Sequence, residues 1–175
     1  MTDNRGFTLI ELLIVVAIIG VIAAVAVPGL MRSRQTANEA SAVESMRAID
    51  GAQTLYAASC GSGFFSPSLS NLGTPAAGGA PFISADLSSG DTVIKSSYTV
   101  TMGSSGGAVA GAPASCNGLA AGAVVQGYFA TATPLPGAGA KAFGVNTYHS
   151  IYQAVQGTAI AMTDTTAPAG AAPIQ

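Results

Sequence analysis

The stretch "RGFTLIELLIVVAIIGVIAAVAVPGLMRSR", residues 5 to 34, decides the fold because it is apolar enough to cross a membrane yet contains one carboxylate. No charge occurs from Leu12 to Met31, and a helix of that length, rising about 1.5 Å per residue, spans about 30 Å, one hydrocarbon core. Glu11 stands at the outer end of this run. A carboxylate inside lipid is costly unless it is paired or reaches the interface. Glu11 therefore either extends to the lipid headgroups or has a partner.

The composition excludes several classes of function. A chain of 175 residues with one apolar run has room for a single modest domain behind one anchor. Six Lys and Arg against eight Asp and Glu leave no basic patch, so we expect no nucleic-acid binding by the bulk domain. Cys60 and Cys116 are an even count on what should be the outer side of a membrane, which favours a disulfide. Two free thiols, or exchange with another chain, are the alternatives.

The apolar segment, residues 7–31, continues into an amphipathic helix over residues 32–59, so the spacing predicts one rod of about 50 residues. At about 100° per residue the second half has a wet arc and an opposite, covered arc. The wet arc holds Glu39, Glu44, Arg47 and Asp50, and the covered arc holds Met46, Ala48, Ile49, Ala52, Leu55 and Tyr56.

Gly20 and Pro28 interrupt the apolar half of this helix. Proline removes a backbone hydrogen bond and kinks a helix, and glycine costs about 1 kcal/mol relative to alanine. The interval from Gly20 to Pro28 is thus the weakest part of the rod, and we expect a bend or a local opening there.

Beyond the helix, residues 60–95 read as a variable Gly/Ser/Pro-rich loop and residues 96–156 as an antiparallel sheet head. β-Rich runs between turn residues predict strands at Ser97 to Met102, Val124 to Thr133, Ala142 to Asn146 and Ser150 to Val155. Residues 157–175 form a C-terminal tail, in which TDTTAPAGAAPIQ is expected to be disordered. The predicted fold is therefore α+β: a long N-terminal helix, apolar in its first half and amphipathic in its second, packed on a small antiparallel sheet.

No motif in the chain predicts an active site, so we expect no enzyme, no cofactor and no metal. Residues 103–107 match the nucleophile pattern G-x-S-x-G, but no helix follows, and no acid lies between Ser105 and the only histidine, His149. The match is interpreted as chance. His149 lies in a predicted turn without a cysteine or carboxylate nearby in sequence, which favours a solvated turn residue over a metal ligand.

Three interpretations of the N-terminus compete. A secretory signal cut after Ala26 would release a domain starting at Val27, but the weakly charged leader and Glu11 inside the apolar region count against it. A plain anchor leaves Glu11 without a role. A cut between Gly6 and Phe7 would create an α-amine that could pair with Glu11 of a neighbouring copy, because an opposite charge makes a buried carboxylate tolerable. Such a pair would set the axial step of a filament.

Residues 5–34 resemble the class III signal of type IV pilins and of type II secretion pseudopilins: a basic residue, Gly, Phe, Thr, Leu, Ile, Glu, and then an apolar helix with Gly and Pro at the family positions. The resemblance implies that residues 1–6 are a leader peptide, that prepilin peptidase cuts after Gly6, and that Phe7 is N-methylated. It makes Glu11 the assembly glutamate and Gly20 to Pro28 the segment that loses helix in a filament. Many pilins enclose a C-terminal loop with their cysteines, and Cys60 and Cys116 depart from that pattern.

The function implied by the resemblance is that of a structural subunit of a type IV pilus, polymerised through its N-terminal helix for adhesion, motility or DNA uptake. The implied partners are further copies of the chain in a helical homopolymer, minor pilins, prepilin peptidase, and a membrane platform protein with its assembly ATPase. The precursor would lie in the bacterial inner membrane before it joins an extracellular pilus.

Two alternatives remain. The first is a type II secretion pseudopilin in a periplasmic pseudopilus; such heads often hold calcium through clustered acids, whereas Asp86 and Asp91 are the only acids between Asp50 and Asp164. The second, more distant alternative is a soluble secreted binding domain cleaved after Ala26.

Overall fold

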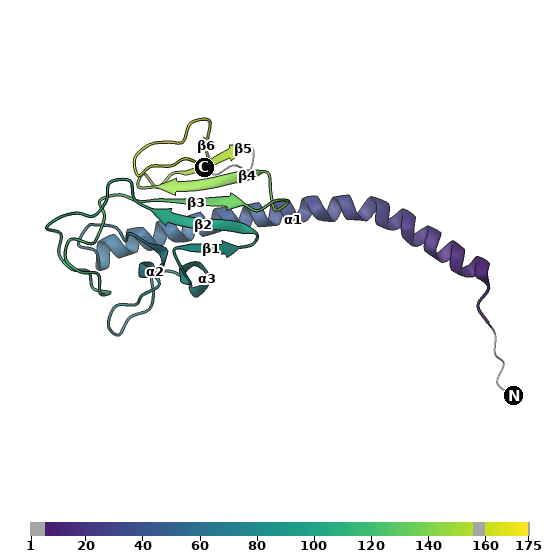
Figure 1. Ribbon diagram of the computed structural model, residues 1–175, viewed down its shortest axis with the longest axis horizontal. Helices are drawn as coiled ribbons and strands as arrows, with labels where there is room; N and C mark the ends of the chain where they lie inside the picture. The colour runs from purple at the N-terminus through teal and green to yellow at the C-terminus, as the bar shows by residue number, and fades with distance from the viewer. Residues whose placement is uncertain (1–5, 156–159, 175) are drawn as a thin grey trace.

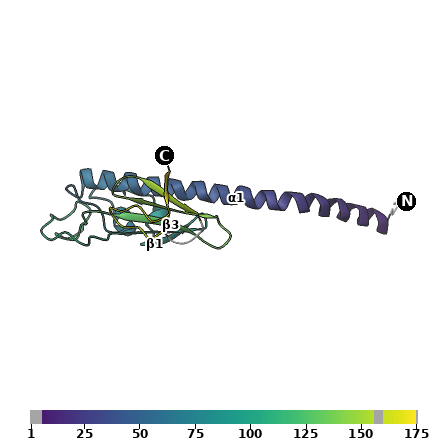
Figure 2. The same ribbon diagram turned by 90° about the horizontal axis from the view of Figure 1, so that it is seen from above.

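A single long helix dominates the molecule (Figure 1). The structure, a computed structural model, describes residues 6–155 and 160–174; most of the leader and the boundary at 156–157 lie outside these residues. Helix α1 (Leu9–Ser59) is 51 residues long. Its first half extends away from the head, and its second half lies along one face of a sheet (Figures 1 and 2). The predicted α+β arrangement is confirmed.

The head is a six-stranded antiparallel sheet in which neighbours in space are also neighbours in sequence. Its strands are β1 (Thr92–Lys95), β2 (Tyr98–Gly103), β3 (Phe129–Pro134), β4 (Lys141–Asn146), β5 (Ile151–Val155) and β6 (Ala172–Ile174). Val93, Val100, Ala132 and Phe143 stand opposite one another on successive strands and are all buried in the core against α1. Side chains two residues apart share a face of a strand, so this register gives the sheet one apolar face for the helix.

The helix buries a stripe of residues spaced three and four apart, as one face of a helix requires. The stripe consists of Ala42, Ser45, Met46, Ile49, Ala52, Gln53 and Tyr56. The predicted covered arc was wrong at its edge, because Ala48 is exposed and Leu55 keeps 55 % of its surface exposed. The predicted wet arc was also partly wrong, since Glu39 and Asp50 are half-buried. The head thus covers the side of the stripe that carries Glu39 and Asp50. The opposite side, with Ala48 and Leu55, stays exposed.

The side chain of Gln53 holds the segment that follows α1 inside the core. Its side chain is fully buried, its Nε2 donates to the carbonyl of Ser66 at 2.8 Å, and its Oε1 accepts from the amide of Ser66 at 2.9 Å. A buried backbone group without a partner costs about 1–3 kcal/mol, and this amide satisfies two such groups at once. This role of Gln53 is not predictable from the sequence, because a lone glutamine on a covered arc has no distinctive spacing.

Short helices and one strand occupy part of the predicted loop 60–95. These are α2 (Leu69–Leu72), α3 (Ala85–Ser88) and β1. Leu69, Leu72 and Leu87 are completely buried in the same core as α1 and the sheet. Three leucines within a Gly/Ser/Pro-rich segment therefore fix the path of this connection.

Three of the four predicted strands correspond closely to β2, β4 and β5. The fourth begins late: β3 starts at Phe129, whereas Val125 forms isolated bridges to Phe65 and Ala108. Gly127 lies between these two pairings, and a Cβ on it would lie 2.7 Å from Cβ of Asp164. The close approach of the C-terminal segment at Gly127 therefore separates the two halves of the predicted strand.

The expected disorder of the last residues was wrong for residues 163–174. Asp164 is buried, and β6 pairs with β5 in the register Ile151↔Ile174. Just before this segment, Met162 packs over β4, where a Cβ on Gly144 would overlap its sulfur. The composition is typical of disorder, yet this part of the chain pairs with β5 and packs over β4.

Candidate functional site

The N-terminal end of α1 holds Glu11 in a local hydrogen-bonded ring. The Glu11 carboxylate accepts from the amide of Thr8 at 3.1 Å and from its hydroxyl at 2.8 Å, and the Glu11 amide donates back to that hydroxyl oxygen at 3.3 Å. This is a capping box, which satisfies donors that an open helix end leaves free. The T-x-x-E signature at Thr8 is the signal in the sequence that predicts this contact. In a single chain, Glu11 thus has Thr8 as its partner.

Beyond this cap, residues 9–34 of α1 are all exposed. The large apolar side chains of this half are open to solvent, from Leu9 at 82 % to Met31 at 58 % exposed. By length and composition this helix could cross a membrane, a test that signal sequences also pass. Monomeric soluble proteins rarely expose so large an apolar surface, which normally marks a membrane or protein contact.

Gly20 and Pro28 both lie within this bare half, and the helix runs through them without a break. The bare half curves away from the axis of the packed half (Figure 1). A Cβ on Gly20 would meet no atom within 4 Å. Neither residue therefore serves the packing of the head, and their expected effect on the helix stays a prediction.

The disulfide joins the end of α1 to the loop between β2 and β3. Cys60 bonds to Cys116, 56 positions away. The amide of Cys116 also donates to the carbonyl of Cys60 at 3.2 Å. The favoured pairing of the two cysteines is confirmed, and it closes a long loop that includes β1 and β2.

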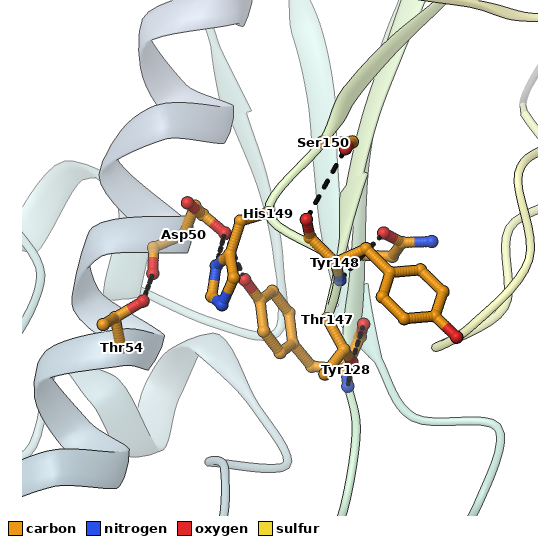
Figure 3. Close-up of polar contacts among 8 residues, drawn as sticks. Asp50, Thr54, Tyr128, Thr147, Tyr148, His149 and Ser150 are labelled. Atoms are coloured by element: carbon orange, nitrogen blue, oxygen red, sulfur yellow. Dashed lines mark hydrogen bonds and ion pairs between the residues drawn. The ribbon is translucent and has the colours of Figure 1, made fainter.

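A polar cluster connects the middle of the packed helix to the turn between β4 and β5 (Figure 3). Asp50 accepts from the Tyr128 hydroxyl at 2.5 Å and lies 2.8 Å from Nδ1 of His149. Burial raises the pKa of Tyr128 above its ordinary value, and the hydrogen bond to Asp50 raises it further. His149 is half exposed in the predicted turn, but it has a carboxylate partner that the sequence analysis missed, because Asp50 is 99 positions away.

A second set of contacts fixes the turn between β3 and β4 to the helix. The amide of Ala140 donates to the Glu39 carboxylate at 3.1 Å. The Tyr98 hydroxyl, close to Glu39, donates to the carbonyl of Lys141 at 2.8 Å. Burial, reinforced by the charge of Glu39, raises the pKa of Tyr98 to about 12. Glu39 is thus a structural acid at the edge of the head.

The G-x-S-x-G segment binds the C-terminal part of the chain. The buried Asp164 carboxylate accepts from the amides of Ser105 and Gly106, at 2.9 and 3.0 Å, and from the Ser104 hydroxyl at 3.0 Å. His149 lies instead against Asp50. The serines therefore serve as donors to a structural carboxylate. Over residues 6–155 and 160–174, no group of three His, Cys, Asp or Glu is placed to hold a metal ion.

Replacing Asp164 with Asn is expected to destabilise the head by about 1–3 kcal/mol, because an amide nitrogen cannot accept a hydrogen bond and at least one of the partly buried donors that converge on this carboxylate loses its partner. Urea unfolding of the full chain in detergent measures the change. The control is Asp91→Asn, at an exposed carboxylate whose pKa is lowered by the Ser70 hydroxyl. Equal midpoints for the two variants would contradict a structural role for Asp164.

Comparisons with known proteins identify the N-terminal segment. A family model described as "Prokaryotic N-terminal methylation motif" matches residues 1–27. The chain carries the N-terminal methylation motif. The resemblance to type IV pilins and type II secretion pseudopilins is thereby confirmed, and relatives of both kinds are found. No solved structure matches the chain.

Three relatives illustrate the range of proteins similar to this chain. It is 39 % identical over 56 residues to the type II secretion system core protein G of Klebsiella pneumoniae, which is 32 % of this chain and 40 % of that protein. It is 45 % identical over 53 residues to the type IV major pilin protein PilA of Myxococcus xanthus, 30 % of this chain and 24 % of that protein. It is 56 % identical over 39 residues to the type IV wide pilus major component PilA4 of Thermus thermophilus, 22 % of this chain and 30 % of that protein. The chain therefore matches less than half the length of each relative.

Proposed function

We propose that the chain is a structural subunit of a type IV pilus, processed by prepilin peptidase between Gly6 and Phe7 and polymerised through α1. The observation that carries the proposal is the division of this helix. Its second half is packed on the head, while its first half, which carries most of the methylation motif, exposes apolar residues along its whole length. A filament in which copies align in parallel would cover this surface.

The capping box suggests how the Glu11 carboxylate has a partner both in the single chain and in the filament. In the single chain Thr8 satisfies the carboxylate. In the filament the methylated amine of Phe7 on an incoming subunit would pair with Glu11 of a subunit already packed. A subunit in the wrong register would leave both charges unpaired in an apolar core, which costs several kcal/mol. Before assembly the precursor would lie in the bacterial inner membrane, where a platform protein, an assembly ATPase and minor pilins are its expected partners.

The second candidate is a type II secretion pseudopilin, and the similarity to core protein G favours it. Asp86 and Asp91, the two acids that could contribute to a calcium site, each contact a different partner. Lys95 is 2.8 Å from Asp86 and lowers the pKa of that carboxyl below its ordinary value, whereas Asp91 accepts from the Ser70 hydroxyl. Because Asp86 and Asp91 do not share a site, the pilus remains the preferred proposal.

The third candidate, a secreted domain released after Ala26, requires a cut inside α1. That cut would leave the packed part of the helix attached to the head, but it would discard most of the methylation motif. Nothing in the head would then account for Glu11.

The intact mass and the N-terminal residue of the protein sheared from the cell surface test the proposal. We expect a chain that begins with methylated Phe7 and sediments with filaments. A methylated chain found only in the periplasm would favour the pseudopilin. A chain beginning at Val27 would overturn both filament proposals.

A further inference from the structure

A groove lies where α1 leaves the head. Its volume is about 380 Å³, and it lies between the helix, the turn between β1 and β2, and the turn between β3 and β4. We call it the neck groove. Its lining residues are Met31, Arg34, Asn38, Ser97 and Leu135, Pro136, Gly137 and Ala138. Both turns lie at the end of the sheet nearest the bare helix (Figure 1).

The walls of the neck groove are fixed within the single chain. Nδ2 of Asn38 donates to the carbonyl of Ala138 at 3.2 Å. The amide of Leu135 donates to the carbonyl of Ser97 at 2.9 Å, which ties one turn to the other. The groove is therefore already formed before any ligand arrives, which reduces the ordering cost of binding.

The lining combines a cation with apolar surface. Met31 and Leu135 are 58 % and 36 % exposed, and the Arg34 guanidinium belongs to the same groove. Among the described residues, neither Arg34 nor its neighbour Arg32 forms an ion pair. A guanidinium favours phosphate because it can donate two parallel hydrogen bonds. An amphiphilic anion fits this combination.

The position of the groove along the helix selects the kind of anion. Met31 ends the uncharged run that begins at Leu12, and Arg34 follows about 4.5 Å further along the axis. If that run fills the hydrocarbon core, the groove opens at the level of the lipid headgroups. Its apolar rim is continuous with the bare helix that would face the acyl chains.

We propose that the neck groove of the membrane-resident subunit binds the headgroup of an anionic phospholipid. The phosphate would lie on Arg34, the glycerol and ester groups near Asn38 and Ser97, and an acyl chain along Met31 and Leu135. This inference rests on the membrane stage of the proposed function. The bound lipid would set the depth of the subunit in the bilayer, and it would have to leave when the subunit enters a filament.

Native mass spectrometry of the full chain in neutral detergent, titrated with dioleoyl phosphatidylglycerol, tests the proposal. The variant is Arg34→Gln, and the matched control is Arg32→Gln, which removes the same charge two residues away and outside the groove. Loss of a charge-assisted bond to phosphate weakens binding roughly tenfold or more, whereas loss of a general surface attraction weakens it about fivefold. We expect one tightly bound lipid, lost in Arg34→Gln and retained in Arg32→Gln.

Several results would overturn the proposal. Equal losses in the two variants would indicate diffuse attraction, and equal binding of dioleoyl phosphatidylcholine would exclude selection of an anion. Full competition by inorganic phosphate would indicate a free anion instead of a lipid. If Arg34→Gln binds lipid normally but forms no filaments, the occupant of the groove is a second copy of the chain.

Flotation of the full chain with phosphatidylcholine vesicles separates this inference from the proposed function. A chain that fails to float in the wild type and in both variants would contradict the membrane stage itself. The titration in detergent does not depend on insertion into a bilayer, so it still decides whether the groove selects the lipid.

Discussion

The Glu11→Gln variant is expected to produce no filaments, although its helix should begin normally. Glutamine at this position of a capping box still bonds with the Thr8 hydroxyl and amide, but it would carry no charge to pair with the amine of Phe7 in the proposed filament. An amine buried in an apolar core without its carboxylate costs about 3–5 kcal/mol per subunit. Because that cost recurs at every subunit, assembly should fail even though each chain is folded and processed.

Immunoblots of the sheared surface fraction and of whole cells measure this effect. Thr8→Ala is the matched control, because it removes the cap but keeps the charge, at a cost of about 1 kcal/mol in helix stability. We expect normal chain levels in both variants and filaments only in Thr8→Ala. Filaments in Glu11→Gln together with a loss in Thr8→Ala would show that Glu11 serves only as a capping residue.

Removing the disulfide by Cys60→Ala and Cys116→Ala is expected to destabilise the head by about 4 kcal/mol. A cross-link restricts the unfolded chain more as the loop it closes grows, and this loop joins positions 56 apart. Typical domains are stable by only about 5–15 kcal/mol. The double variant should therefore lose a large part of its stability.

Chemical unfolding of the full chain in detergent, followed by circular dichroism, measures that loss. Reductant should shift the wild-type midpoint to that of the double variant and leave the double variant unchanged. A reduced wild-type chain that unfolds at its original midpoint would show that packing alone stabilises the end of α1.

The parts of the fold that follow from local periodicity were predictable. Three features could be predicted from a few turns of helix or a few residues of strand. They are the apolar run, the buried stripe at three- and four-residue spacing, and the alternation of buried and half-buried residues in β2. β6 could not be predicted, because its three residues include Pro173 and acquire strand structure only by pairing with β5. The reach of the head around Glu39 and Asp50 likewise depends on turns that are distant in sequence.

The candidate sites divide in the same way. Glu11 and its partner Thr8 are three residues apart, so their contact can be predicted from the geometry of one helical turn. Asp50 meets His149 from 99 positions away, and Asp164 meets Ser105 from 59. A single sequence contains no signal that links residues at such distances, since only the packing of the sheet brings them together.

The polar contacts between α1 and the head have a mechanical consequence. Glu39, Asp50 and Gln53 hold the turn between β3 and β4, the turn between β4 and β5, and the segment after the helix, respectively. Along the helix these three attachments span about 20 Å. A load on the outer surface of the head therefore reaches the helix as shear distributed over these three attachments, which oppose rotation of the head about any one of them. Tension on the head is thus transmitted to the helix at three points instead of one.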